Sequence, residues 1–180
     1  MKNTATVCGP VRRQTALMVG VFLSALLTAS HATAEEMIKN QGFEGADCTP
    51  GVGQGCLPWT FKPNTAVNDE EHSGNKGATV GGLGSGPGML TQAIMFRAGT
   101  YNFSFWYKAT SGDAGLTPAI VRIAGRTVFA EILKPGTDWR LYQMSVQVDN
   151  DGPATIEISS ERPPHYAGPS FQIDDVSLKE

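Results

Sequence analysis

The sequence predicts an all-β protein, an antiparallel β-sandwich of the jelly-roll type with about nine or ten short strands. Apolar and polar residues alternate in short stretches, and no segment keeps the 3.6-residue period of a helix. Turn residues separate these stretches, and the chain has 21 glycines and 11 prolines among 180 residues. A single sandwich fits this length, and we place it at residues 35–180.

The clearest expected strand is 100–110. Its aromatic residues Tyr101, Phe103, Phe105 and Tyr107 share one side, which predicts a strand that packs an aromatic face on the core. Turn signals such as "SGDAG", "KPGTD" and "DNDGP" bound the later strands, and we expect the first and last strands to pair. In chain order, the expected strands are 36–44, 57–61, 77–82, 88–96, 100–110, 118–125, 126–133, 139–149, 154–161 and 171–180.

The closing strand 171–180 carries two adjacent carboxylates in its middle. Its apolar residues occupy odd positions before Asp174 and even positions after Asp175. A β-bulge produces such a change of phase, so we predict one here. The bulge could turn one carboxylate towards a cation while the other faces water.

Residues 1–34 are predicted to be a cleaved export signal. Basic residues near the start precede an apolar run at 16–27, and Ala32-x-Ala34 has the small residues that signal peptidase requires. The run is shorter than the roughly 20 residues that span a bilayer. We therefore expect a secreted or periplasmic protein whose mature chain has no membrane span.

The charge of the chain argues against a nucleic-acid partner. The 14 basic residues are outnumbered by 17 acidic residues, and the basic residues form no cluster. Beyond the export signal, only Cys48 and Cys56 remain as cysteines. In an oxidising compartment this pair predicts a local disulfide rather than a metal site, because no further cysteine and no suitably spaced pair of histidines accompanies it.

Six segments occur in an order that resembles a known family. They are "IKNQGFE", "PW", "HSGNKG", "GTYNFSFWYKA", "DWRLYQMSVQV" and "FQIDDVSL". The chain is similar, from about residue 37 to residue 178, to the CenC-like carbohydrate-binding modules of the family 4/9/16/22 type, in the galactose-binding-domain-like superfamily. The resemblance implies a jelly-roll fold and a poly- or oligosaccharide as the partner.

The resemblance also implies a structural calcium ion near the paired termini. The matching positions are Glu44, the turn from His72 to Lys76 that includes Asn75, and Asp174 or Asp175. Calcium takes oxygen ligands of these kinds, both carboxylates and carbonyls. The alternative is that these acids are solvated loop residues.

Aromatic side chains are the first candidates for contact with a sugar, because a flat ring stacks on the C–H face of a pyranose. Trp106 is out of phase with the core face, so it points outward or into a cleft, unless a loop buries it. Trp59 lies beside the expected disulfide loop, and His165 and Tyr166 lie in the loop before the last strand. We expect Trp139 to pack in the core.

Polar residues on the strand faces are the second group of candidates. Arg122, Gln143 and Glu157 could line a cleft, and the alternative is an ordinary solvated face. We predict no enzymatic activity, because neither His72 nor His165 has a neighbouring nucleophile motif and adjacent carboxylates on one strand point opposite ways. The alternative function is an extracellular or cell-surface module of the same fold with a protein partner.

Overall fold

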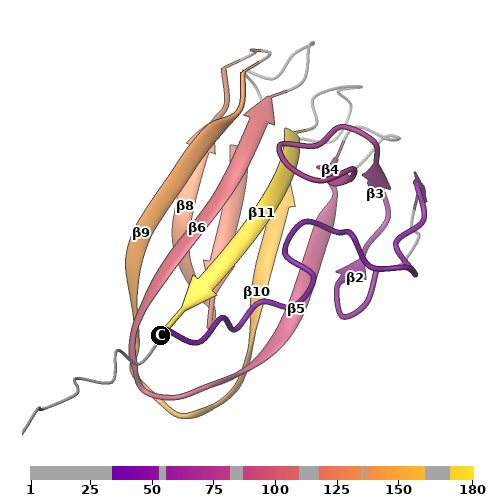
Figure 1. Ribbon diagram of the computed structural model, residues 1–180. Coiled ribbons are helices and arrows are strands. Elements are labelled where there is room, and N and C mark those ends of the chain that lie inside the picture. Colours follow the sequence, from indigo (N-terminus) through magenta and orange to yellow (C-terminus); the bar gives the residue numbers. More distant parts are fainter. Residues whose placement is uncertain are drawn as a thin grey trace, which may run out of the picture. The chain divides into compact units, whose positions relative to one another are not determined.

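The structure, a computed structural model, describes residues 34–52, 56–81, 87–109, 118–134, 136, 138–160 and 171–180. These residues form two antiparallel β-sheets and contain no helix (Figure 1). The prediction of an all-β antiparallel sandwich is confirmed. No helix in the described ranges is long and apolar enough to cross a membrane.

The first sheet has six strands, and the last strand of the chain lies inside it (Figure 1). The partners of this last strand are the strand 77–80 on one side and the long aromatic strand on the other. Across the sheet, the strands are β1 (Gly51–Val52), β3 (Thr65–Asn68), β4 (Gly77–Val80), β11 (Phe171–Lys179), β6 (Gly99–Ala109) and β9 (Arg140–Val148).

The second sheet has five strands and packs its apolar face on the first. Most of its strands match the expected stretches closely, since alternation is clear in each of them. Across the sheet, the strands are β2 (Thr60–Phe61), β5 (Met89–Phe96), β10 (Gly152–Ser160), β7 (Pro118–Ile123) and β8 (Arg126–Ile132).

The core lies between the sheets, and β6 contributes most of its aromatic rings. Tyr101, Phe103, Phe105 and Tyr107 are buried, as the alternation in this strand predicts. Apolar residues of β5, β7 and β10 belong to the same buried cluster. Because successive residues of a strand point to opposite faces, the polar neighbours of these rings are directed to the outer face of the sheet.

The expected first strand at 36–44 is wrong. Positive φ angles of 52° at Asn40 and 59° at Phe43 turn the chain, which an extended strand does not allow. The segment nevertheless pairs with β11, as expected for the two ends: Glu36 forms a bridge with Lys179, and the N–H of Val176 donates to Gln41 O (Figure 1).

The predicted β-bulge in the last strand is confirmed. The register between β11 and β6 shifts between Asp174 and Ser177, and Asp175 has a φ of 49°. Phe171 and Ile173 face the core before the shift, and Val176 and Leu178 face it afterwards. Asp174 follows Ile173 in regular alternation and so lies on the outer face, where it pairs with Trp106, and the extra residue Asp175 returns Val176 to the core face.

Candidate functional site

A hollow of about 510 Å³ lies on the outer face of the five-stranded sheet, and we call it the Arg122 pocket. Arg122 of β7 is directly opposite Glu157 of β10, and its Nη1 donates to Glu157 Oε1 over 2.6 Å. Both side chains are half-buried. The pocket is lined by Lys62, Pro87, Gly88, Met89, Arg122, Ser159 and Ser160.

Ser159 gives the Arg122 pocket an unsatisfied polar group. Its side chain is 3% exposed, and its Oγ has no hydrogen-bond partner among the described residues. Thr65 Oγ1 shares this property but does not line the pocket, and the neighbouring Ser160 Oγ accepts the N–H of Gly88 over 2.9 Å. An unpartnered buried hydroxyl costs about 1–3 kcal/mol, which a ligand hydroxyl could recover.

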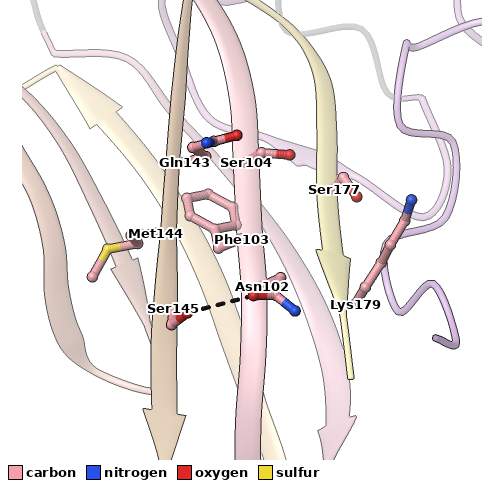
Figure 2. Close-up of a pocket in the computed structure, with 8 residues that line it drawn as sticks. All are labelled: Asn102, Phe103, Ser104, Gln143, Met144, Ser145, Ser177 and Lys179. Carbon is pink, nitrogen blue, oxygen red and sulfur yellow. Dashed lines mark hydrogen bonds between the residues drawn. The ribbon is translucent and has the colours of Figure 1, made fainter.

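A second hollow of about 410 Å³ lies on the outer face of the six-stranded sheet, and we call it the polar groove. Figure 2 shows that its polar side chains come from three neighbouring strands, whereas the side chains of Phe103 and Met144 are directed away from them. The polar lining comprises Asn102 and Ser104 of β6, Gln143 and Ser145 of β9, and Ser177 and Lys179 of β11.

Trp106 lies on the same outer face as the polar groove, but a loop covers one side of its ring. The imidazole of His72 stacks on it, with the ring centroids 3.8 Å apart and the planes at 13°. Trp106 is therefore directed outward, as predicted. The β3–β4 loop also partly buries it, so the alternative of burial by a loop holds in part. A sugar cannot stack on the ring face that His72 occupies.

Trp139 was expected in the core, and this prediction is wrong. The residue is half-buried on the outer face, 5.8 Å from His72 between ring centroids, and Lys108 Nζ lies 5.0 Å from its ring centroid. Trp139 comes immediately before β9. It alternates in step with Leu141 and Gln143 and therefore points outward as they do.

Trp59 is a core residue, so its prediction as a ligand contact does not hold. The side chain is 1% exposed, packs 5.6 Å from Phe43 between ring centroids, and donates its indole N–H to Asn40 O over 2.9 Å. Of the other predicted ligand residues, Arg122 and Gln143 line hollows on opposite sheets. His165 and Tyr166 lie outside the described residues.

Asp174 is fully buried and accepts backbone hydrogen bonds. Its Oδ2 accepts the N–H groups of His72 over 2.8 Å and Ser73 over 3.0 Å, and its Oδ1 accepts the N–H of Asp175 over 2.7 Å. Burial raises the pKa of Asp174 to about 6, and the neighbouring charge of Asp175 adds to the rise. The alternative of solvated loop acids therefore fails for Asp174.

Glu44 and Asp175 also contact the β3–β4 loop, at residues 72–76. Glu44 Oε1 accepts the N–H groups of Asn75 over 2.6 Å and Lys76 over 2.8 Å. Asp175 Oδ2 lies 2.7 Å from His72 Nδ1. The turn of residues 72–76 thus presents N–H donors to the acids, and His72 and Asn75 contact them without acting as oxygen ligands.

The carboxylates of Asp174 and Asp175 approach one another near Gly42, and the Cγ methylene of Glu44 lies beside them. A Cβ placed at Gly42 would lie 3.3 Å from Asp174 Oδ1, 3.5 Å from Asp175 Oδ1 and 3.8 Å from Glu44 Cγ. No group of three or more His, Cys, Asp or Glu side chains within the described ranges is arranged to hold a metal ion. The chemistry of the donors nevertheless suits calcium, which binds carboxylate oxygens.

Cys48 and Cys56 form the predicted disulfide. Asn40 Nδ2 lies 2.9 Å from Cys48 Sγ and 3.0 Å from Cys56 Sγ, which links the bridge to the turn that begins the domain. The disulfide therefore holds together the loop region beside Trp59 and not the two sheets.

The family described as "Carbohydrate binding domain" (CBM_4_9) has a sequence model that matches residues 35–166. The chain belongs to this family. The resemblance in the sequence is thus confirmed, and the two hollows are candidate surfaces of a carbohydrate-binding domain. No curated protein matches the sequence.

Several solved structures share the fold of this carbohydrate-binding domain. One is the module TmCBM61 in complex with β-1,4-galactotriose, with a TM-score of 0.57, 21% identity, and coverage of 82% of this chain and 100% of that chain. Another is the CBM22-1 xylan-binding domain of Xyn10C from Paenibacillus barcinonensis, with a TM-score of 0.51, 14% identity, and coverage of 81% and 94%. At these identities the likeness shows the fold alone.

Sequence reasoning missed Ser159, Lys62 and the serines of the polar groove. Serine and lysine are ordinary on solvated strands, so no local signal distinguishes them. The register of the strands brings Ser159 beside Arg122 and Glu157, and Ser104 beside Gln143 and Ser177. Only the pairing of strands that are distant in the sequence could reveal these groups.

Proposed function

We propose that this chain is a secreted, non-catalytic carbohydrate-binding module that binds an oligo- or polysaccharide in the Arg122 pocket. The observation that carries the proposal is the buried Ser159 hydroxyl without a partner, beside the Arg122–Glu157 ion pair. A sugar hydroxyl can both donate and accept, so it can satisfy Ser159 while it bonds to the guanidinium or the carboxylate. Met89 and Pro87 supply apolar surface for the C–H groups of the ring.

The decisive variant is Ser159→Ala. The mutation removes a hydroxyl that has no partner in the described part of the protein, so we expect stability to be unchanged or slightly raised. Affinity should fall about tenfold, which corresponds to the loss of one hydrogen bond of about 1.4 kcal/mol. A glycan array identifies the ligand, and calorimetry measures the affinity of both proteins.

The matched control is Thr155→Ala. Thr155 is exposed on the same strand and the same face, and it does not line the pocket. We expect its affinity to equal that of the wild type. If Ser159→Ala and Arg122→Gln both bind the selected glycan as the wild type does, the pocket is not the site. If no glycan binds at all, the alternative of a protein-interaction module is favoured.

The absence of catalysis belongs to the same proposal. Retaining and inverting glycosidases use two carboxyl groups about 5–9.5 Å apart on either side of the scissile bond. Glu157 is engaged with Arg122, and Asp174 accepts three backbone N–H groups, so neither is placed as a free acid or base. We expect no new reducing ends when the protein is incubated with the glycan that it binds.

Export through a signal at residues 1–34 is likewise a proposal. It is supported by the basic, apolar and small-residue segments of this stretch. We expect the protein recovered from the periplasm or medium of an expressing cell to begin at Glu35. N-terminal sequencing tests this expectation, and a mature chain that still begins at Met1 would contradict it.

We further propose a structural calcium ion held by Glu44, Asp174 and Asp175. The approach of the Asp174 and Asp175 carboxylates near Gly42 and the burial of Asp174 support this proposal, because a cation would offset the repulsion between these two charges. Calcium at 100 times its dissociation constant would stabilise the fold by about 2.7 kcal/mol. The melting temperature should therefore fall in EGTA and recover with excess calcium. A melting temperature that EGTA does not change, with no calcium found by elemental analysis, would refute this proposal.

A further inference from the structure

We infer that the polar groove is a second saccharide-binding site, specific for uncharged sugars, on the sheet opposite the Arg122 pocket. The inference rests on the geometry of the groove and on membership in the carbohydrate-binding family, and it does not depend on the Arg122 pocket. Two sites on opposite outer faces would allow one domain to bind two glycan chains.

The groove is built from two cross-strand rows of outward side chains. In the first row, Lys179 of β11 and Ser145 of β9 flank Asn102 of β6. In the second row, Ser177 and Gln143 flank Ser104 in the same way. Neighbouring strands are about 4.8 Å apart and the rows about 7 Å apart, so the polar atoms cover an area of sugar-ring size.

The shape of the groove follows from the sizes of these side chains. Three serines, Ser104, Ser145 and Ser177, contribute only short hydroxymethyl groups, whereas Gln143 and Lys179 extend further from the sheet (Figure 2). Ser177 is the first residue of β11 that pairs with β6 after the β-bulge, where the register between the two strands shifts. The long side chains of Gln143 and Lys179 stand at two diagonal corners, and the short serines at the other two corners and at Ser104 leave a shallow depression between them.

The hydrogen-bonding groups of the groove suit a polyhydroxylated ligand. Ser145 Oγ donates to Asn102 Oδ1 over 3.4 Å (Figure 2). Ser177 Oγ donates to Glu36 Oε2 over 2.6 Å. The side chains of Ser104 and Gln143 form no hydrogen bond with any residue in the described ranges. Ser104 is half-buried and Gln143 is exposed, so both can bond to a ligand. A hydroxyl and an amide both donate and accept, as a sugar hydroxyl does.

The charge and the apolar border of the groove narrow the ligand class. Among the described residues that line the groove, Lys179 alone is charged, so these residues form no cluster of cations that would attract an acidic sugar. In the next row along the strands, Trp106 lies between the buried Asp174 and Leu141, and Leu141 is 46% exposed. Polar groups beside the exposed side chain of Leu141 match the hydroxyl edge and the C–H face of a neutral pyranose.

The test is an NMR titration of the mature protein with β-1,4-galactotriose and with soluble xylan oligosaccharides. We expect two groups of perturbed amide signals, one around Ser104 and Gln143 and one around Ser159. The variant Ser104→Trp should fill the groove and lower its affinity at least tenfold, while the signals around Ser159 still respond. Because Ser104 faces outward, the larger side chain should not disturb the core.

Gln143→Ala is the second variant, and Gln147→Ala is its matched control. Gln147 is exposed on the same strand and face but lies outside the groove, next to Thr100. Gln143→Ala should weaken groove binding about threefold to tenfold, and Gln147→Ala should leave it unchanged. A long soluble xylan should be cross-linked by the wild type, with rising turbidity, and not by Ser104→Trp.

The outcomes separate the two sites. If neither sugar perturbs the signals around Ser104 at millimolar concentration, or if those perturbations survive in Ser104→Trp, the groove is not a saccharide site. Perturbation around Ser104 alone, without any around Ser159, supports the groove and contradicts the Arg122 pocket. If the amide signals around Ser104 respond to a protein partner and to no sugar, the proposal of a saccharide ligand is wrong.

Discussion

The carboxylate of Asp174 accepts the backbone N–H of His72 over 2.8 Å, although the two residues are 102 positions apart in the chain. This hydrogen bond connects the bulge of β11 to the β3–β4 loop. The same loop places the imidazole of His72 on the ring of Trp106. The buried acid therefore organises one end of the outer face of the six-stranded sheet, next to the polar groove.

Asp174→Ala should destabilise the protein by about 2–4 kcal/mol, because three backbone N–H groups lose their acceptor and two of them belong to the loop. Asp174→Asn should cost less, since its carbonyl oxygen can accept one or two of these hydrogen bonds. Urea denaturation in EGTA measures both effects without a contribution from calcium. Asp149→Ala, at an exposed position, is the control, and equal midpoints for all three variants would contradict this account.

Gly74→Ala should destabilise the fold more than Gly125→Ala. Both glycines have positive φ angles, 74° and 78°, so each alanine would be strained by about 1–2 kcal/mol. At Gly74 the added Cβ would also lie 2.3 Å from Glu44 Oε1, whereas no atom lies within 4 Å at Gly125. Displacement of Glu44 would break its bonds to Asn75 and Lys76. Chemical denaturation of the two variants tests this order. Equal losses of the free energy of unfolding would show that Glu44 can move aside without destabilising the protein.

The double variant Cys48→Ser, Cys56→Ser should lose about 2–3 kcal/mol, as expected for a short closed loop of this separation. The two sheets should remain folded, since the bridge connects residues of one loop region. The fluorescence of Trp59 should change, because Asn40 contacts both the bridge and the indole. Circular dichroism and urea denaturation check these expectations, and complete loss of β structure at 25 °C would contradict them.

Trp106→Ala should lower stability by about 1–2 kcal/mol through loss of the stack with His72. Affinity at the Arg122 pocket should stay within about twofold of the wild type, because the pocket lies on the other sheet. Trp139→Ala, which removes the edge contact with His72 and the cation–π contact with Lys108, should cost less. Loss of affinity without loss of stability would show that the ligand binds at Trp106 and not in the Arg122 pocket.

Much of the fold could be predicted because its strands alternate strongly in hydrophobicity. In β6 the aromatic residues identify the core face, and in β11 the change of phase around Asp174 identifies the bulge. The segment 36–44 misled the prediction, because the backbone turns at Asn40 and Phe43 leave no mark in an alternating pattern. The strand β3 was missed, because its residues Thr65–Asn68 show no alternation of apolar and polar side chains.

The candidate residues were less predictable, because local sequence does not show what covers a side chain. Trp59 and Trp139 exchanged their expected roles: the first is buried beside Phe43, and the second is half-buried on the outer face with His72. Each environment is created by a distant segment. Arg122 and Gln143 were recognised as outward residues, but their association with separate hollows depends on the sheets that contain them.

The sequence by itself determined the all-β class, the disulfide pair, the family, and the positions where β11 changes phase. These features depend on residue type and on spacing along one strand. The tertiary structure decided that Asp174 is a buried acceptor for His72 and Ser73, that Ser159 lacks a partner beside Arg122, and that three serines form a groove. These depend on strand register and on loop packing, which bring together groups that are far apart in the chain.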